Sequence, residues 1–115
     1  MISQEIYLEK YDWRILVFYG LKEEDTDEVC NSLVQIGCTE KAVESAREHC
    51  LRGMPNTGLT YSNLAGRKSV VAVSRTTSEY EFVNTVTHEI FHVVTHICDC
   101  LLYTSPSPRD MRRSR

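Results

Sequence analysis

The ten residues from Thr87 to His96, THEIFHVVTH, hold the side chains of this sequence that are best suited to chemistry. They contain the pattern His-Glu-x-x-His, which on a helix places His88 and His92 about 6 Å apart along the axis. Two imidazoles at that separation can bind one zinc ion, Zn²⁺, through Zn–N bonds of about 2.0–2.1 Å. Glu89 lies beside them and can act as general base for a water molecule that the ion activates. The spacing therefore indicates a zinc site suited to hydrolysis.

The helical phase of the segment separates its polar side chains from its apolar ones. At about 100° per residue, His88, His92 and Glu89 fall within about 100° of one another. The apolar positions are expected to form a second stripe that faces the core, made of Phe82, Val86, Ile90, Val93 and Ile97. We therefore expect the two histidines and Glu89 to be adjacent, on a face open to solvent on one side.

A strand is the alternative for this segment, because many of its residues are β-branched. In a strand, His88 and His92 would stand about 13 Å apart, and one metal ion could not join them. Ser78, followed three residues later by Glu81, has the spacing of a helix capping box. This cap, the length of the segment and its apolar stripe favour a helix over residues 79–97.

Other candidate ligands fit the expected site less well. His96 lies about 12 Å from His88 along the helix axis, too far for both to bind one ion together with His92, so we expect it near the site or at the surface. His49 is expected to interact with the dipole at the end of another helix, and a ligand role is its minor alternative. Cys98 and Cys100 are unfavourable as zinc ligands, because they lie on the same helix as the two histidines and a third protein ligand normally comes from another element.

Five further segments are expected to position the motif helix. Residues 13–19, WRILVFY, are typical of a buried strand, with which residues 5–9 can pair. Two helices follow: Gly37 ends the first, and the second extends from an N-cap at Thr39 to Gly53. Residues 58–62 and 68–74 are expected to form an antiparallel hairpin across NLAGR. The expected fold class is α+β, with a short antiparallel or mixed sheet packed on helices.

Composition bounds the class of protein. With 115 residues, 42% of them hydrophobic and 25% charged, the chain is expected to form one globular domain. Its N-terminus lacks the features of a signal peptide, and no window reaches the ~18 apolar residues of a membrane span. The five cysteines match neither a disulfide framework nor a zinc knuckle, so we expect reduced, mostly buried thiols. These features predict a cytoplasmic protein without a membrane partner.

Residues 103–115, YTSPSPRDMRRSR, differ in character from the rest of the chain. They hold four Arg and one Asp, whereas residues 1–102 are acidic overall, which gives no support to nucleic-acid binding. The stretch LLYTSPSPRD is similar to translated sequencing-adapter DNA. We therefore expect 103–115 to be a non-native, disordered tail and 1–102 to be a single domain. The natural chain is expected to continue past about Leu101 with other residues.

A strand, a short linker and a helix with His-Glu-x-x-His resemble the zincin metallopeptidases, and in particular their minimal gluzincin type. More narrowly, IGCTEKAV, NTGLTYSN and SVVAVSRTTSEYEFVNTVTHEIFH resemble a family of short zincin-like proteins of bacteriophages and gut bacteria. The likeness extends from about Trp13 to Cys100. It implies a small zincin-like domain, incomplete at its C-terminus, that hydrolyses peptide bonds.

The resemblance also implies roles for individual residues. His88 and His92 are implied as zinc ligands and Glu89 as the catalytic acid, while the third ligand would be a glutamate about 20 residues beyond His92, where this chain carries its adapter-like tail. A peptide or protein substrate is implied to add to an edge strand made of Ser69, Val70, Val71, Ala72, Val73 and Ser74.

Two functions stay open at this point. The first is a zinc metallopeptidase, truncated before its last ligand. The second is a non-catalytic interaction module of phage or mobile-element origin that keeps the motif helix for its packing. Substrate specificity and oligomeric state are open in both.

Overall fold

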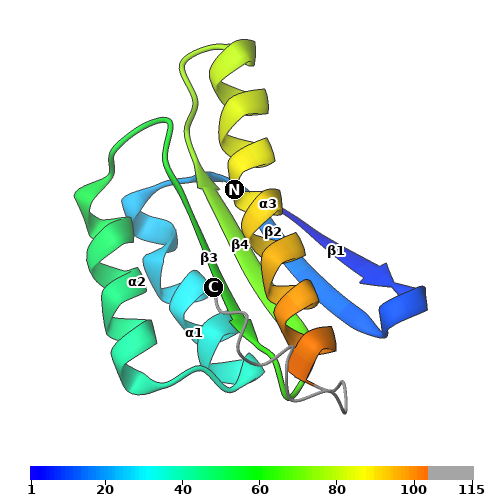
Figure 1. The fold of residues 1–115 in the computed structure, drawn as a ribbon. Coiled ribbons are helices and arrows are strands. Elements are labelled where there is room, and N and C mark those ends of the chain that lie inside the picture. Colours follow the sequence, from blue (N-terminus) through cyan, green and yellow to red (C-terminus); the bar gives the residue numbers. More distant parts are fainter. Residues whose placement is uncertain (104–115) are drawn as a thin grey trace.

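The structure, a computed structural model, describes residues 1–103 and has an α+β fold built on one mixed four-stranded sheet (Figure 1). The tail predicted for 103–115 lies, apart from Tyr103, outside the described residues. In chain order the elements are β1 (Ile2–Leu8), η1 (Glu9–Tyr11), β2 (Trp13–Leu21), η2 (Glu23–Asp25), α1 (Thr26–Ile36), α2 (Glu40–Arg52), β3 (Gly58–Asn63), β4 (Lys68–Ser74) and α3 (Glu79–Tyr103). The order of strands and helices matches the sequence prediction.

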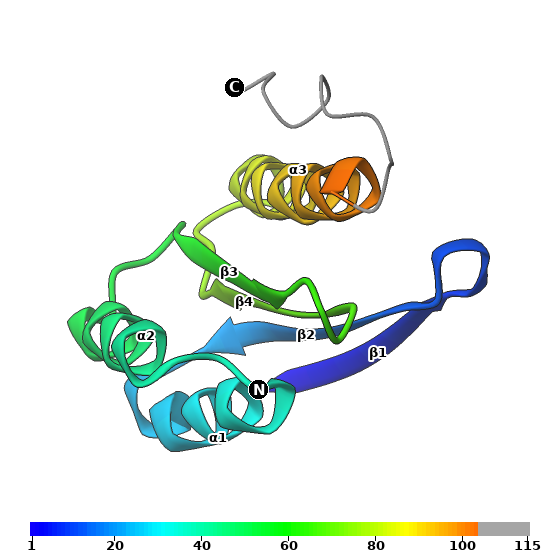
Figure 2. The ribbon, with the colours of Figure 1, turned by 60° about the horizontal axis from the view of Figure 1, so that its bottom comes forward.

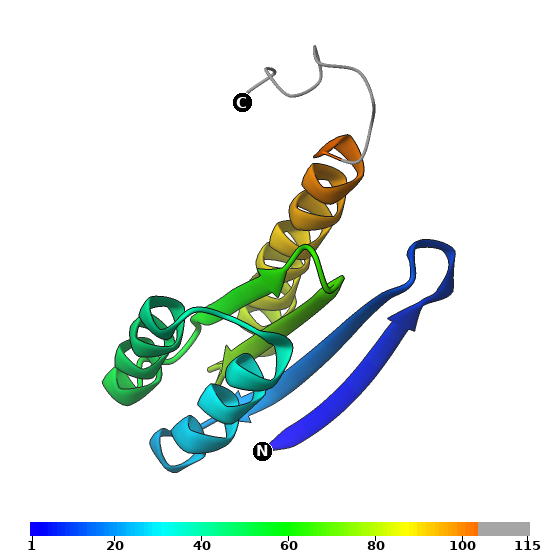
Figure 3. The same ribbon diagram turned by 90° about the horizontal axis from the view of Figure 1, so that it is seen from below.

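The strands lie in the order β1-β2-β4-β3, so β1 and β3 form the two edges of the sheet (Figure 3). β2 pairs with β1 antiparallel and with β4 parallel, and β3 pairs with β4 antiparallel. The predicted hairpin of β3 and β4 is therefore confirmed. The prediction that Ser69–Ser74 form an edge strand is wrong, because β4 is hydrogen-bonded on both sides.

The sheet separates two layers of helices, with α3 on one face and α1 and α2 on the other (Figure 2). Because side chains alternate along a strand, the central pair sends every second residue to each layer. The α3 side of the core contains Trp13, Ile15, Val17, Val71, Val73, Val93, Ile97 and Cys100. The other side contains Phe18, Leu21, Val29, Leu33, Ala46, Cys50, Leu59, Val70 and Ala72.

A β-bulge changes this alternation at the end of β2. The register shifts between Tyr19 and Leu21, and the intervening Gly20 has a φ of 74°, a conformation that glycine adopts without steric strain. Leu21 thus joins Phe18 on the side of α1 and α2. The bulge lets β2 end on an apolar side chain that packs beneath the two helices.

Local signals fix the ends of the helices. The Thr39 side chain accepts a hydrogen bond from the Ala42 N–H and caps α2, as predicted, and left-handed glycines end α1 at Gly37 and α2 at Gly53. The Ser78 hydroxyl oxygen accepts a hydrogen bond from the Glu81 N–H at 3.1 Å, just before α3. The motif segment is therefore helical, and it extends beyond the predicted residue 97. Among the described residues, no helix is long and apolar enough to cross a bilayer.

All five cysteines are free, as predicted. Cys30, Cys50 and Cys100 are buried, Cys38 is half-buried, and Cys98 is exposed. Burial raises the pKa of the Cys50 thiol to about 11 and also raises the pKa of Cys30. Since the thiolate is the reactive form, these two side chains should be unreactive in the folded protein.

We expect a disulfide reagent to modify Cys98 first and Cys50 only after unfolding. A thiol with a pKa of about 11 is ionised in only about one molecule in 10⁴ at pH 7. Absorbance from a chromogenic disulfide reagent, read in native buffer and then in guanidinium chloride, measures the two classes. The Cys98→Ser variant should lose the fast phase, and fast reaction of Cys50 in the native protein would contradict this core.

Candidate metal centre

The two histidines of the motif converge on one point in space. His88 is exposed and His92 is half-buried on α3, and their Nε2 atoms lie 3.1 Å apart. The rings meet edge to face, with centroids 4.6 Å apart and planes at 88°. The predicted common direction of these side chains is therefore confirmed. It follows from the helical repeat, which places residues four apart on neighbouring turns of one face.

This geometry fits two of the ligands of a zinc ion. Two nitrogens bound to one tetrahedral zinc at about 2.0–2.1 Å stand about 3.3 Å from each other. The observed separation of 3.1 Å is close to that value, so little side-chain movement is needed to bind the ion. Without metal, the same separation suits an N–H of one ring donating to the bare nitrogen of the other. Zinc binding needs the lone pair of both nitrogens, whereas the hydrogen bond needs a lone pair on only one of them.

Glu89 is placed differently from the prediction. It lies on the inner face of α3 and is only 5% exposed, whereas the helical phase predicted an open face for it. The buried face of α3 is centred near Glu89 and includes Thr85, Val93, Ile97 and Cys100. The apolar stripe predicted to face the core was therefore placed too far around the helix from the histidines. Its N-terminal member, Phe82, is 39% exposed.

Strand β3 holds the Glu89 side chain in place. The Thr60 hydroxyl lies 2.6 Å from Glu89 Oε1 and 3.3 Å from the Glu89 main-chain oxygen, so it can donate to either. Gly58 leaves space for the carboxyl group: a Cβ at that position would stand 2.7 Å from Glu89 Cγ and 3.0 Å from the Ala72 carbonyl oxygen. The carboxyl group is thus fixed from the sheet as well as from its own helix.

A cleft of about 390 Å³ opens beside the motif. Its lining residues come from the last turn of α2, the start of β3 and the residues just before it, and the first half of α3. All its lining residues are polar or lack a large apolar side chain: His49, Asn56, Thr57, Gly58, Asn84, Thr85, His88 and Glu89. The cleft therefore brings a motif histidine and the candidate base to one open space.

His49 enters this cleft from α2, opposite the motif. Its side chain is half-buried, and burial together with the nearby Arg52 charge lowers its pKa, while the charge of Glu89 acts in the opposite direction. The sequence predicted an interaction of His49 with the helix end, with a ligand role as the minor alternative. Its position on the cleft wall could not be read from helical spacing, because it depends on how α2 packs across the sheet edge from α3.

His96 belongs to a different polar cluster, one helical repeat further along α3. Its Nδ1 lies 2.6 Å from the Ser62 hydroxyl, which lies 2.6 Å from that of Ser69. The Ser69 hydroxyl in turn accepts a 2.9 Å hydrogen bond from the Trp13 indole N–H. Burial and the nearby His92 lower the pKa of His96. His96 therefore connects α3 to the sheet. It lies next to the motif on the helix, in line with the expectation that it would be near the zinc site without binding the ion.

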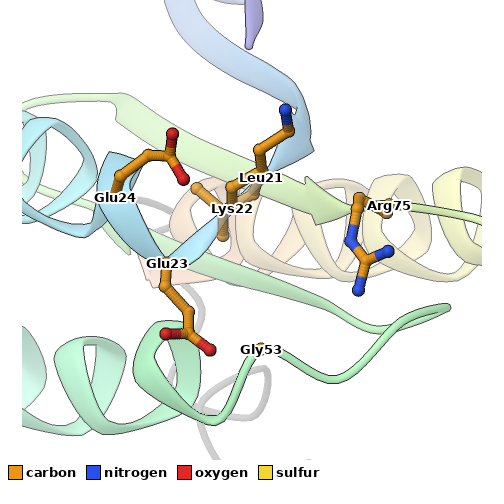
Figure 4. Close-up of a pocket in the computed structure, with 6 residues that line it drawn as sticks. All are labelled: Leu21, Lys22, Glu23, Glu24, Gly53 and Arg75. Atoms are coloured by element: carbon orange, nitrogen blue, oxygen red, sulfur yellow. The ribbon is translucent and has the colours of Figure 1, made fainter.

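A second hollow, of about 450 Å³, lies away from the motif at the ends of β2 and β4. Figure 4 shows its lining side chains, among which Lys22 and Arg75 are basic and Glu23 and Glu24 are acidic. Glu23 projects toward Gly53 (Figure 4). With opposite charges of equal number and no histidine or cysteine, this hollow offers no group comparable to the motif.

Within residues 1–103, no three His, Cys, Asp or Glu side chains form a group that could hold a metal ion. The described part of the chain thus provides two converging imidazoles and no third protein ligand beside them. Cys98 and Cys100 take no part in the pair: Cys98 is exposed, and the Cys100 thiol donates to the Leu64 carbonyl oxygen at 3.5 Å. No protein-family model, curated protein or solved structure matches this chain.

The supporting residues Gly58 and Thr60 were missed at the sequence level, although a signal for them exists. In GLTYSN the small or polar residues Gly58, Thr60 and Ser62 alternate with Leu59 and Tyr61. This alternation marks a strand with one apolar face and one face reserved for polar contacts. What it could not tell is that Glu89 and His96 would lie opposite that polar face.

We expect Thr60→Val to lower the free energy of unfolding by about 1–3 kcal/mol, because it leaves the buried Glu89 carboxyl group without its hydroxyl donor. Thr60→Ser keeps the hydroxyl and should stay within a fraction of that loss. Urea unfolding followed by circular dichroism measures both variants. Equal stability of the valine and serine variants would show that the contact with Glu89 does not hold α3 on β3.

Proposed function

We propose that this protein is a zinc-dependent metallopeptidase with a small zincin-like fold. The observation that carries the proposal is the 3.1 Å approach of His88 Nε2 and His92 Nε2 on a helix whose intervening Glu89 faces an adjoining cleft. Zinc, when bound, lowers the pKa of water and polarises a substrate carbonyl group. The five free thiols agree with a reducing compartment, so we place the protein in the cytoplasm.

Glu89 performs the proton transfers in this proposal. It takes a proton from the attacking water while the water oxygen forms a bond to the carbonyl carbon and the carbonyl π electrons move to its oxygen. It then gives the proton to the amide nitrogen as the carbon–nitrogen bond breaks. The hydrogen bond to Thr60 occupies Oε1, which leaves Oε2 for this exchange. A carboxyl group fixed from two sides loses little freedom when the substrate arrives.

The peptide is placed along β3 in this proposal. β3 is an edge strand that pairs only with β4 among the described residues, so its outer main-chain groups are free to pair with an extended peptide. Gly58, its first residue, and the preceding Thr57 line the same cleft as His88 and Glu89. A peptide added here would therefore pass the candidate base, whereas β4 has no free edge.

The Glu89→Gln variant should keep its zinc and its fold but lose about 10²–10⁴ of the hydrolysis rate, because the amide cannot accept the proton. The His88→Ala variant should instead lose zinc, since one imidazole alone holds the ion poorly. Zinc affinity from calorimetric titration and cleavage of unfolded protein substrates at saturating zinc measure the two effects. Equal cleavage by the wild type and Glu89→Gln, with zinc bound to both, would exclude this function.

A second candidate function rests on the outer face of α3. Apolar side chains there are largely exposed, with Tyr80 at 75%, Phe91 at 64% and Val94 at 50%. They belong to a series that alternates in steps of four and three residues: Tyr80, Asn84, Thr87, Phe91, Val94, Cys98 and Leu101. Such spacing is typical of a helix that packs against another helix. Because the series extends along most of α3, we take the α3 helix of a second copy as its partner.

In the interaction-module alternative, the protein forms dimers through this face, and Phe91→Glu should make it monomeric by burying a charge in the interface. Val34 on α1 is also exposed, at 61%, so Val34→Glu is the matched control and should leave the mass unchanged. Light scattering after gel filtration gives the masses. A wild type that stays monomeric at high concentration would contradict the self-association on which this alternative depends.

A further inference from the structure

We infer that His49 contacts the substrate of the proposed peptidase and donates a hydrogen bond to the oxygen of the carbonyl group whose carbon is attacked by water. The inference rests on the proposed function and extends it to a residue outside the motif, on another helix. His49 lines the cleft together with His88 and Glu89. It therefore faces the same space that the reacting peptide group would occupy.

The His49 imidazole is not engaged in holding the fold. Within residues 1–103 its ring forms no hydrogen bond, in contrast to His96, whose Nδ1 is paired with Ser62. Among the described residues, no fully buried side-chain nitrogen or oxygen lacks a partner. Neither ring nitrogen of the half-buried His49 is therefore fully buried, and because His49 lines the cleft, a ligand there can pair with the ring.

The chemistry of His49 suits a neutral hydrogen-bond donor. Burial and the Arg52 charge lower its pKa, so the ring is neutral at pH 7 and carries one N–H. A neutral ring does not form an ion pair with Glu89 and leaves that carboxylate free to accept a proton. As the carbonyl π electrons move to oxygen, the oxygen becomes a stronger acceptor, and its bond with the His49 N–H strengthens.

Two other roles of His49 are disfavoured by the geometry. As a metal ligand it would have to join His88 and His92, but no group of three such side chains within metal reach exists in residues 1–103. If His49 served to hold the fold together, its ring would be expected to hydrogen-bond with α2, β3 or α3. No such bond of the ring is present within residues 1–103. A side chain that faces a cleft beside a general base, unpaired, is instead a candidate for substrate contact.

The test compares His49→Ala with His49→Gln, which restores an N–H donor, and with Glu48→Ala on the exposed side of the same helix turn. Circular dichroism and thermal melting first establish that the variants fold. We expect His49→Ala to lower kcat by about 10²-fold with little change in KM, as for the loss of one donor to a developing oxyanion. His49→Gln should recover part of kcat, and Glu48→Ala should behave as wild type.

Two binding measurements separate the explanations. Calorimetric titration with zinc alone should give the same affinity for wild type and His49→Ala, whereas a loss like that of His88→Ala would make His49 a ligand and overturn the inference. A phosphinic peptide, which mimics the tetrahedral oxyanion, should bind zinc-loaded His49→Ala at least about tenfold more weakly than wild type. An unchanged kcat or an unchanged phosphinic-peptide affinity would also overturn it.

Failure of the proposed function gives a different result. In that case zinc-loaded wild type cleaves no peptide, and the inference is decided by the phosphinic peptide alone. Equal affinity for wild type and His49→Ala, or no binding to wild type, then overturns the inference as well. Cleavage by wild type with an unaltered rate in His49→Ala would overturn the inference and leave the proposed function intact.

Discussion

The parallel pairing of β2 with β4 is the interaction on which the rest of the structure depends. Both strands lie inside the sheet, and helices cover both of their faces. Successive side chains face opposite helix layers, so the side chains on both faces must be apolar. Val70 and Ala72 face α1 and α2, while Val71 and Val73 face α3. A slip of one residue in this register would exchange the two sets and leave both layers without a matching surface. The position of α3, and with it the motif, follows from this register.

The side chains of β3, at the edge of the sheet, also alternate between the two helix layers. On the α3 side, however, they are small or polar, whereas those of the central strands are apolar. Gly58, Thr60 and Ser62 have the same parity and lie beneath the inner face of α3, which presents Glu89 and His96. The two contacts of 2.6 Å that result satisfy groups whose burial without a partner would cost about 1–3 kcal/mol each. Because hydrogen bonds are directional, this polar contact fixes the rotation of α3 about its axis more closely than apolar packing alone would.

The sequence predicted what depends on local chemistry and failed where distant segments meet. The helix caps, the glycine stops and the convergence of His88 with His92 follow from neighbouring residues, and all were predicted. The edge position of β4 was wrong because strand order depends on which partner β2 selects about 50 residues away. The continuous apolar run SVVAV is nonetheless typical of a strand covered on both faces. The burial of Glu89 was missed because its acceptor needs are met by Thr60, a residue of another element.

These relations couple the stability of the domain to the chemistry of the motif. His88 and His92 lie at the border between the buried and exposed faces of α3, so a small rotation of the helix would either bury them against the sheet or turn them into solvent. The contact of Glu89 with Thr60 opposes that rotation, and Gly58 permits the contact because a Cβ there would stand 2.7 Å from Glu89 Cγ. The same carboxyl group therefore orients the helix and faces the cleft. A substitution at Gly58 should consequently disturb packing and the proposed chemistry together.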